Sequence, residues 1–148
     1  MRDALRQKVQ VRDEYRCLYC GITELDIGST LTIDHIQPKQ QGGTDNVDNL
    51  LYCCHACNEF KGKYYKTAPE LQLLNPLVDN FAEHYQEQDN GTLLAITERG
   101  AKHIEVLHLN RPRLVQNRLR KLYNEERDTY VAALEAELRE LRQRSSTE

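Results

Sequence analysis

The chain has 148 residues, enough for one ordinary domain or for a small motif with an attached extension. Its hydrophobic content of 39% includes two Phe and no Trp, which predicts a thin core, and its net charge of −3 excludes a uniformly basic protein, so any surface that binds nucleic acid must be local. No apolar run is long enough to cross a bilayer and the N-terminus lacks the apolar stretch of a signal peptide, so we expect a cytoplasmic protein without membrane contact.

Residues 1–66 alternate short regular segments with loops, which predicts a small motif. Apolar spacing and turns rich in Gly, Asn or Pro indicate where each segment begins and ends. The expected elements, in chain order, are a helix over 2–16, a tight knuckle at 17–21, a loop over 22–30, a strand at 31–36, a loop over 40–48, a strand at 50–54 and a helix from 57 to about 65.

Residues 67–148 are expected to form a mainly helical extension. Whether this extension packs on the same core as the motif stays open. Pro76 lies in a connector, and Asn110 followed by Pro112 marks the start of a long helix. The expected elements are a strand at 92–97, a helix over 100–109 and a helix from about 112 to 142. The whole chain is therefore expected to be an α+β protein.

Four of the five cysteines form two C-x-x-C pairs, Cys17 with Cys20 and Cys54 with Cys57. This spacing is typical of a tetrahedral four-cysteine zinc site, because the turn within each pair lets both sulfurs face one ion. Four thiolates leave no open coordination position, so the Zn²⁺ ion would be structural and would tie together the two ends of the strand–loop–strand segment. The alternatives are four buried unligated thiols or a redox pair, and no βαβ pattern supports the redox pair.

Cys53 leaves the register of the second pair open, because side chains alternate along a strand and only one of Cys53 and Cys54 can face the ion. Cys54 keeps the C-x-x-C spacing with Cys57, so we assign Cys54 as the ligand. His55 also offers a metal-binding side chain, although a residue inside such a knuckle usually points away.

Four polar residues near the two strands and the following helix have the chemistry that phosphodiester cleavage needs. His35 can accept a proton from water, because an imidazole titrates near neutral pH. Asp34 and Asn58 offer oxygen ligands for one hard divalent cation, Mg²⁺ or Mn²⁺. Asn49 precedes the second strand and is placed to orient the imidazole through its amide carbonyl.

Asp34 and His35 are adjacent in the predicted strand, and adjacent strand side chains face opposite sides. Both reach one phosphate only if the strand ends, twists or bulges there, which the nearby Pro38 favours. A histidine alone at this place would favour a surface or hydrogen-bonded residue. The four polar residues in this order favour the catalytic interpretation.

This order of residues resembles that of the HNH endonucleases, whose ββα-metal site cuts phosphodiester bonds. The resemblance covers residues 12–63 and rests on the two cysteine pairs, Asp-His-Ile-x-Pro, Gly-Gly, Asn-Leu and Cys-x-x-Cys-Asn-x-x-Lys-Gly. It implies that His35 is the general base, Asn49 the orienting residue and Asn58 a metal ligand, with Asp34 as a further ligand. Asn58 departs from the histidine of other members, and because an amide oxygen is harder than an imidazole, we expect Mg²⁺ or Mn²⁺ to be preferred over Ni²⁺ or Zn²⁺.

Basic residues predict local contacts with nucleic acid. Lys61, one helical turn beyond Cys57, either touches a flanking phosphate or is solvated. Over 99–121, seven basic residues accompany one acid, and this run either binds the DNA backbone without reading its sequence or forms an ordinary charged helix face. Within the run we assign Arg111 and Arg113 as nucleic-acid contacts.

An apolar stripe lies near the C-terminal end of the chain. Tyr130, Leu134, Leu138 and Leu141 follow one another at helical spacing. The stripe is either the seam of a homodimer or a face that packs on the protein's own core.

These features together favour a metal-dependent endonuclease that hydrolyses double-stranded DNA and leaves 5′-phosphate ends. One rival is a non-catalytic, zinc-stabilised module that binds nucleic acid, although all four polar residues of the site are present. Another rival is an RNase or toxin that uses the same site. The target site, and the choice between nicking and double-strand cutting, stay open.

Overall fold

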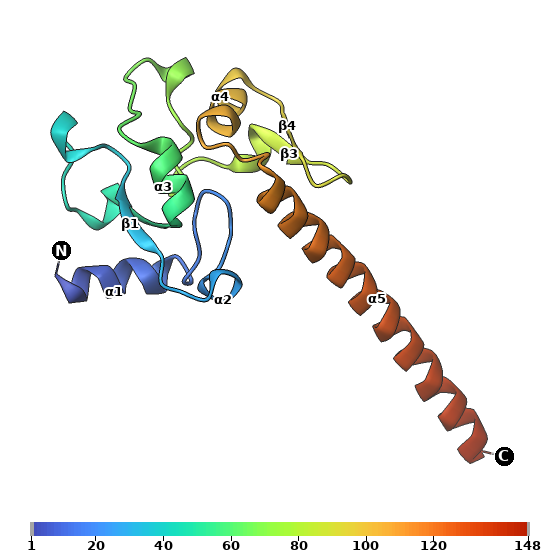
Figure 1. Cartoon of the computed structure of the whole chain (residues 1–148). Helices are drawn as coiled ribbons and strands as arrows, with labels where there is room; N and C mark the ends of the chain where they lie inside the picture. Colours follow the sequence, from blue (N-terminus) through green and yellow to red (C-terminus); the bar gives the residue numbers. More distant parts are fainter. Residues whose placement is uncertain (1, 148) are drawn as a thin grey trace.

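The computed structural model describes residues 2–147, and its elements confirm the predicted α+β class. Two small antiparallel sheets lie among the helices, and one much longer helix extends away from them (Figure 1). The helices are α1 (Asp3–Arg12), α2 (Glu24–Ile27), α3 (His55–Lys61), α4 (Glu98–Val106) and α5 (Pro112–Thr147), and the strands are β1 (Thr32–His35), β2 (Leu50–Cys53), β3 (Tyr85–Glu87) and β4 (Leu93–Ala95).

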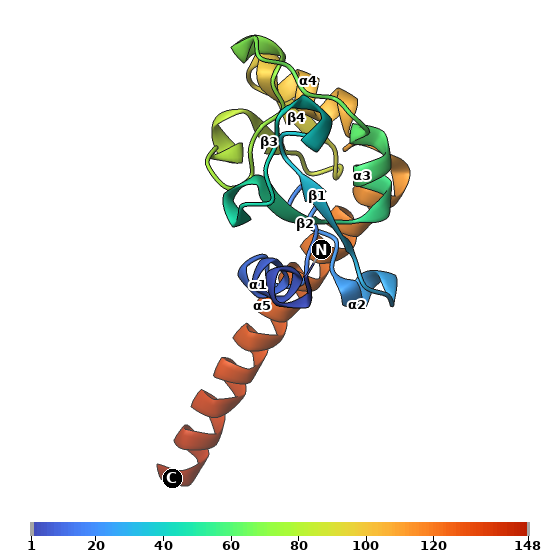
Figure 2. The same cartoon turned by 90° about the vertical axis from the view of Figure 1, so that its left-hand side faces the viewer.

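The first sheet is an antiparallel pair of β1 and β2. His35 lies opposite Leu50 at one end of the pair, and Thr32 lies opposite Cys53 at the other. All four residues of β2 are buried, so this strand belongs to the core. The chain leaves β2 at Cys54 and turns directly into α3, which contacts β1 (Figures 1 and 2).

Several short elements differ from those expected. The predicted loop after the knuckle contains helix α2. A capping box formed by Thr23 and Asp26 stabilises the N-terminus of this helix. A helix of four residues is too short to show an apolar period, so this Thr-x-x-Asp pair was its sequence signal. The N-terminal helix ends early, at Arg12, because Glu14 and Tyr15 both adopt a φ of 56° that breaks a right-handed helix. Strand β3, which pairs with β4, was not expected.

One buried cluster contains side chains from both parts of the chain. Residues of the first sheet and the knuckle lie in it together with residues of the extension, so the extension packs on the same core. The division of the chain at residue 66 stays a prediction. The cluster consists of Val9, Cys17, Tyr19, Ile22, Leu31, Leu50, Leu51, Tyr52, Cys53, Cys54, Cys57, Leu93, Leu107, Leu109 and Leu114.

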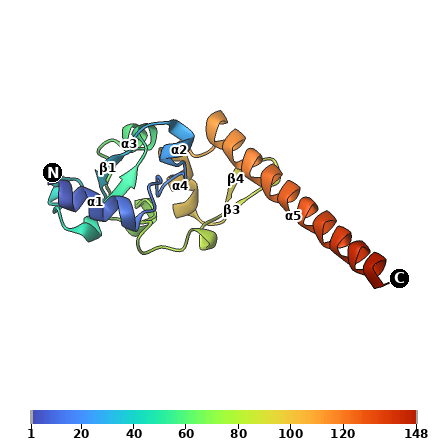
Figure 3. The ribbon, with the colours of Figure 1, turned by 90° about the horizontal axis from the view of Figure 1, so that it is seen from below.

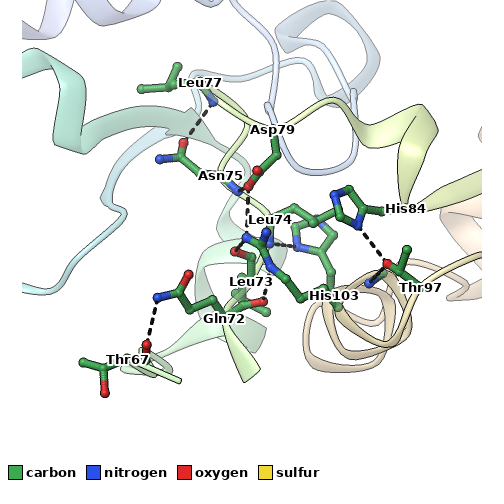
Figure 4. A network of polar contacts seen from close by, with 12 residues as sticks. Thr67, Gln72, Leu73, Leu74, Asn75, Leu77, Asp79, His84, Thr97 and His103 are labelled. Carbon is green, nitrogen blue, oxygen red and sulfur yellow. Dashed lines mark hydrogen bonds and ion pairs between the residues drawn. The ribbon is translucent and has the colours of Figure 1, made fainter. Parts of the chain in front are cut away.

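His103 of α4 is a fully buried histidine that joins the helix to the connector before it. Its Nδ1 accepts the backbone N–H of Leu74 at 3.0 Å, within a network of polar contacts (Figure 4). The rings of Tyr19, Phe81 and Tyr85 surround it, and its Nε2 has no hydrogen-bond partner among the described residues. Burial lowers the pKa of His103 to about 3, so the imidazole is neutral in the folded chain.

Replacing His103 by Leu is expected to flatten the dependence of stability on pH. Between pH 6.5 and about 3 the unfolded wild-type chain binds a proton that the folded chain does not, so the free energy of unfolding falls as the pH drops through this window. Relative to the variant, the wild type should lose up to about 1.4 kcal/mol per pH unit. Urea unfolding at several pH values measures this difference.

The exposed His55 provides the control for this experiment, because His55→Leu is expected to keep the wild-type dependence on pH. His103→Leu also leaves the Leu74 N–H without its acceptor, which lowers stability at every pH by the same amount. Stability curves of the wild type and His103→Leu that run parallel below pH 6.5 would contradict the prediction.

Helix α5 leaves the rest of the molecule after its first turns. Leu114 and Asn117 are its buried residues, and every residue from 125 to 147 is exposed. Views along two further directions show the helix pointing away from both sheets (Figures 2 and 3). No helix within residues 2–147 is both long enough and apolar enough to span a membrane.

Candidate active site and zinc centre

The four cysteines of the two C-x-x-C pairs meet in one cluster, as the sequence predicts. Their sulfurs all lie within 4.8 Å of one another, and the sulfurs of Cys20 and Cys54 are 3.7 Å apart. Four sulfur ligands at 2.3 Å around a tetrahedral zinc ion lie about 3.8 Å from one another, so the cluster fits this ion. Cys17 and Cys20 come from the knuckle after α1, and Cys54 and Cys57 from the start of α3.

Cys54 rather than Cys53 belongs to the cluster, which confirms the assignment made from the spacing. Cys54 is also the N-cap of α3, since its Sγ accepts the backbone N–H of Cys57 at 3.4 Å. The helix therefore begins at His55, earlier than expected, and His55 is exposed outside the cluster. The buried thiol of Cys53 donates to the Cys54 carbonyl at 3.3 Å.

Arg111 lies on the cysteine cluster, and its predicted contact with nucleic acid stays a prediction. Its guanidinium donates to Sγ of Cys57 at 3.5 Å and to Sγ of Cys54 at 3.9 Å. It also donates to the Leu107 carbonyl at 3.0 Å and lies 5.3 Å from the centre of the Phe60 ring. Four thiolates around one Zn²⁺ ion carry a net negative charge, so this cation is placed to stabilise the loaded site.

Arg111→Gln is expected to release zinc about 10-fold faster than the wild type, within the range found when a partner of metal ligands is removed. The glutamine keeps polarity but loses the positive charge beside the sulfurs. Transfer of zinc to a coloured chelator measures the rate. The matched control is Arg113→Gln, an exposed arginine two residues further along, and equal release rates in all three proteins would disprove the role of Arg111.

Asp34 is a buried carboxylate that is paired with a buried lysine. Its Oδ2 lies 2.9 Å from Nζ of Lys61 and accepts a hydrogen bond from the Tyr19 hydroxyl at 3.5 Å. Burial raises the pKa of Asp34, and the ammonium of Lys61 opposes this rise. Lys61 also donates to the His35 carbonyl at 2.8 Å and is 4% exposed. The alternative that Lys61 is solvated is therefore wrong, and its contact with a flanking phosphate stays a prediction.

His35 ends β1, and a carboxylate from the loop after it holds the imidazole. The Nε2 atom of His35 lies 2.8 Å from Oδ1 of Asp45, and Nζ of Lys39 lies 2.7 Å from Oδ2 of the same carboxylate. Hydrogen bonds from His35 and Lys39 lower the pKa of Asp45, so the carboxylate is ionised and can only accept. In the neutral ring Nε2 therefore carries the proton, and Nδ1 remains as the acceptor.

Asn49 fastens the loop between the two strands. Its Oδ1 accepts the backbone N–H of Gln37 at 2.9 Å, and its Nδ2 donates to the carbonyls of Gln37 at 3.0 Å and Thr44 at 2.8 Å. Thr44 adjoins Asp45, so Asn49 holds the backbone that presents the carboxylate to His35. The predicted direct contact between its amide carbonyl and the imidazole is thus replaced by this indirect one.

Asn58 lies in the first turn of α3, directly after the cluster residue Cys57. Residues three apart on a helix share a face, and Lys61, three residues further on, pairs with Asp34. Asn58 is therefore a near neighbour of Lys61 on the surface of α3. The catalytic roles of Asp34, His35, Asn49 and Asn58 stay predictions.

Several basic residues of the run 99–121 make contacts inside the molecule. Arg99 pairs with Asp79 at 3.0 Å, and Arg118 donates to two backbone carbonyls at 2.6 and 3.0 Å. Arg113, in contrast, is exposed in the first turn of α5. Part of the run is therefore used for contacts within the protein, and its contact with the DNA backbone stays a prediction.

A groove of about 300 Å³ opens beside the buried Lys61. Tyr64, Tyr65 and Lys66, which follow α3, line it together with Arg99. Nζ of Lys66 lies 5.8 Å from the centre of the Tyr64 ring. Aromatic rings and cations in one groove are the groups that bind unpaired bases and their phosphates. This groove and Asp45 are features that the sequence interpretation missed.

Comparison with known proteins relates the site to a nuclease family. Residues 17–63 match the family model for HNH endonuclease. The chain is 42% identical over 57 residues to the CRISPR-associated endonuclease Cas9 of Corynebacterium diphtheriae, covering 38% of this chain and 5% of that protein. It is 25% identical over 135 residues to the Septu protein PtuB of Bacillus mycoides, covering 70% of this chain and 45% of that protein. The chain thus spans less than half of either relative, and no solved structure matches it.

Proposed function

Because residues 17–63 match the family model for HNH endonuclease, we propose that the chain hydrolyses phosphodiester bonds in DNA. The observation that carries this proposal is the hydrogen bond of 2.8 Å between His35 and Asp45 at the end of β1, next in sequence to the carboxylate of Asp34. A histidine oriented by a carboxylate, beside oxygen ligands for a cation, is what the activation of water at a phosphate requires.

His35 acts as the general base in this proposal. The Asp45 carboxylate accepts a hydrogen bond from Nε2–H and fixes the ring, so Nδ1 takes a proton from the attacking water. Asp45 then stabilises the imidazolium that forms, and Lys39 keeps the carboxylate in place at 2.7 Å. Asn49 holds the loop on which Asp45 is carried.

Asp34 and Asn58 would hold one Mg²⁺ or Mn²⁺ ion, which supplies positive charge at the scissile phosphate and at the leaving 3′ oxygen. A carboxylate and an amide are hard oxygen ligands and fit this pair of ions. Lys61 holds the Asp34 carboxylate at 2.9 Å. Cleavage with Ni²⁺ alone and none with Mg²⁺ would overturn the preference.

Double-stranded DNA is the proposed substrate, and 5′-phosphate ends are the proposed products. The groove lined by Tyr64, Tyr65 and Lys66 adjoins Lys61 and hence the proposed cation ligand Asp34, so it supports a nucleic-acid substrate in general and does not distinguish paired from unpaired strands. Arg113, which is exposed in the first turn of α5, is a candidate for a phosphate contact, as is Arg111.

Digestion of supercoiled plasmid tests the proposal. Wild-type protein is expected to yield nicked or linear DNA with Mg²⁺ and only supercoiled DNA when EDTA is added. Retardation of the plasmid without any cleavage product would favour the non-catalytic binding module. Cleavage of a structured RNA but not of the plasmid would favour the RNase, and toxicity on expression that His35→Ala relieves would favour the toxin.

Asp45→Asn is expected to lower kcat about 10- to 100-fold with little change in KM, because a neutral amide orients the imidazole less firmly and cannot stabilise its charged form. The loss should be smaller than that of a variant without the imidazole. Asp48→Asn, which removes an exposed carboxylate from the same loop, is the control and should cleave at the wild-type rate. A kcat for Asp45→Asn equal to the control would rule out the assigned role.

A further inference from the structure

Residues 125–147 of α5 form a helix that is exposed on all sides (Figure 3). At 1.5 Å per residue this part is about 35 Å long. A helix of this length without tertiary packing is marginal in water, since helices in proteins gain most of their stability from the burial of an apolar face. Residues 125–147 of α5 are therefore expected to pack against a surface outside the described part of this chain.

Four aliphatic residues of this helix form a narrow apolar seam: Val131, Leu134, Leu138 and Leu141, each between 41 and 52% exposed. They are spaced by 3, 4 and 3 residues, which are the alternating first and fourth positions of two heptads. Tyr130, which the sequence stripe included, is 65% exposed and lies beside the seam. The side-chain pattern is that of a coiled coil and not of a face that fits an irregular core.

We propose that a second copy of this chain covers the seam in a parallel two-stranded coiled coil. The charged residues beside the seam favour a second copy as the partner and a parallel orientation of the two helices. Glu137 and Arg142 flank the seam on opposite sides, five residues apart, and a parallel copy brings Glu137 of one helix next to Arg142 of the other. Because the pair has two-fold symmetry, this attraction occurs twice.

The antiparallel arrangement is disfavoured by the same residues. With all four seam residues paired, it would bring Glu137 next to Glu137 of the second copy and Glu135 next to Glu135, and these two like-charge contacts oppose its two attractions between Asp128 and Arg142, whereas the parallel pair has two attractions and no like-charge contact. Nucleic acid is also disfavoured as the occupant, because acidic residues outnumber basic ones by six to four over 125–147. The seam therefore fits its own copy best.

The molar mass in solution tests the dimer. Light scattering over a dilution series of the full chain is expected to show a mass near twice 17.3 kDa that falls toward the monomer on dilution. Leu138→Glu places a charge in the centre of the seam and is expected to be monomeric at every concentration. Ala136→Glu adds the same charge on the opposite helix face and is expected to remain dimeric. A wild-type chain that is monomeric throughout overturns the proposal.

Cross-linking tests the orientation. Ser145 continues the seam by one further position, so Ser145→Cys is expected to form a disulfide between parallel copies under mild oxidation, whereas Ser146→Cys, which points outward, is not. A charge swap adds a second readout. Glu137→Arg alone should weaken the dimer, and adding Arg142→Glu should restore it. Failure of the double variant to restore the dimer, or equal cross-linking at both cysteines, overturns the parallel arrangement.

A parallel pair carries both nuclease domains at the same end of the coiled coil. Where the proposed nuclease activity holds, Leu138→Glu is expected to keep nicking plasmid but to yield less linear product than Ala136→Glu. The mass and cross-linking measurements need no cleavage, so an inactive but dimeric protein would reject the nuclease proposal alone. An active monomer would reject the coiled coil alone.

Discussion

His35→Ala is expected to lower the rate of plasmid cleavage by at least about 100-fold, and by as much as 10⁴-fold, which is the range that a positioned general base contributes. The alanine leaves water in the site without a proton acceptor, because no other group is assigned this task. Asp45 is within reach of the imidazole but is ionised, half exposed and paired with Lys39, so it is a poor replacement. Initial rates with Mg²⁺ measure the effect.

Among residues 2–147, the His35 ring hydrogen-bonds to Asp45 alone, so removal of the imidazole should leave the fold intact. The melting temperature of His35→Ala is expected to stay close to that of the wild type, and plasmid binding with Ca²⁺ in place of Mg²⁺ should persist. His55→Ala removes an exposed histidine from the same motif and is the matched control. Cleavage by His35→Ala at the wild-type rate would refute the assignment of the base and with it the proposed mechanism.

Cys54→Ser is expected to abolish cooperative thermal unfolding. Structural zinc contributes about 10–16 kcal/mol in small zinc-binding peptides, which is comparable with the whole stability of an ordinary domain. Cys54 has two roles, as a member of the four-sulfur cluster and as the N-cap of α3, so its loss affects both the metal and the helix that bears Asn58. Circular dichroism on heating and zinc content per chain measure the effect.

The neighbouring Cys53 provides a sharp control for this experiment. It is equally buried, but it lies outside the cluster and donates to a backbone carbonyl. Cys53→Ser should keep one zinc per chain and lose only about 1–3 kcal/mol, as is usual for a polar change in a core. If Cys54→Ser bound zinc and melted like Cys53→Ser, zinc in the four-cysteine cluster would not be what stabilises the fold.

The zinc cluster and the order of the site could be predicted from sequence because both rest on local patterns. The C-x-x-C turn acts within four residues, and the choice of Cys54 over Cys53 needed only the spacing to Cys57. Strands β1, β2 and β4, helix α3 and the start of α5 likewise follow from short-range apolar patterns and from proline positions. Helix α2 and strand β3 are too short for such patterns, and they were missed.

The groups that individual charged side chains contact in the folded chain could not be predicted from local patterns. Lys61 has the sequence context of a surface lysine, yet α3 packs its ammonium against Asp34 and the His35 carbonyl of β1. Arg111 belongs to a basic run, yet the fold brings it to Cys57, 54 residues away in sequence. Whether a long basic side chain meets solvent or a buried anion depends on elements distant in the chain, and no local pattern reports them.

By itself, the sequence determined which residue types this protein has for chemistry: four thiolates for one zinc ion, and an imidazole with oxygen donors around a short hairpin and helix. Only the tertiary structure decided how they are held. It gave the imidazole its partner in Asp45 and turned Asn49 toward the loop backbone. The physical reason is range, since metal spacing and helix periodicity act between near neighbours, whereas hydrogen bonds between buried polar groups form wherever folding brings a donor to an acceptor.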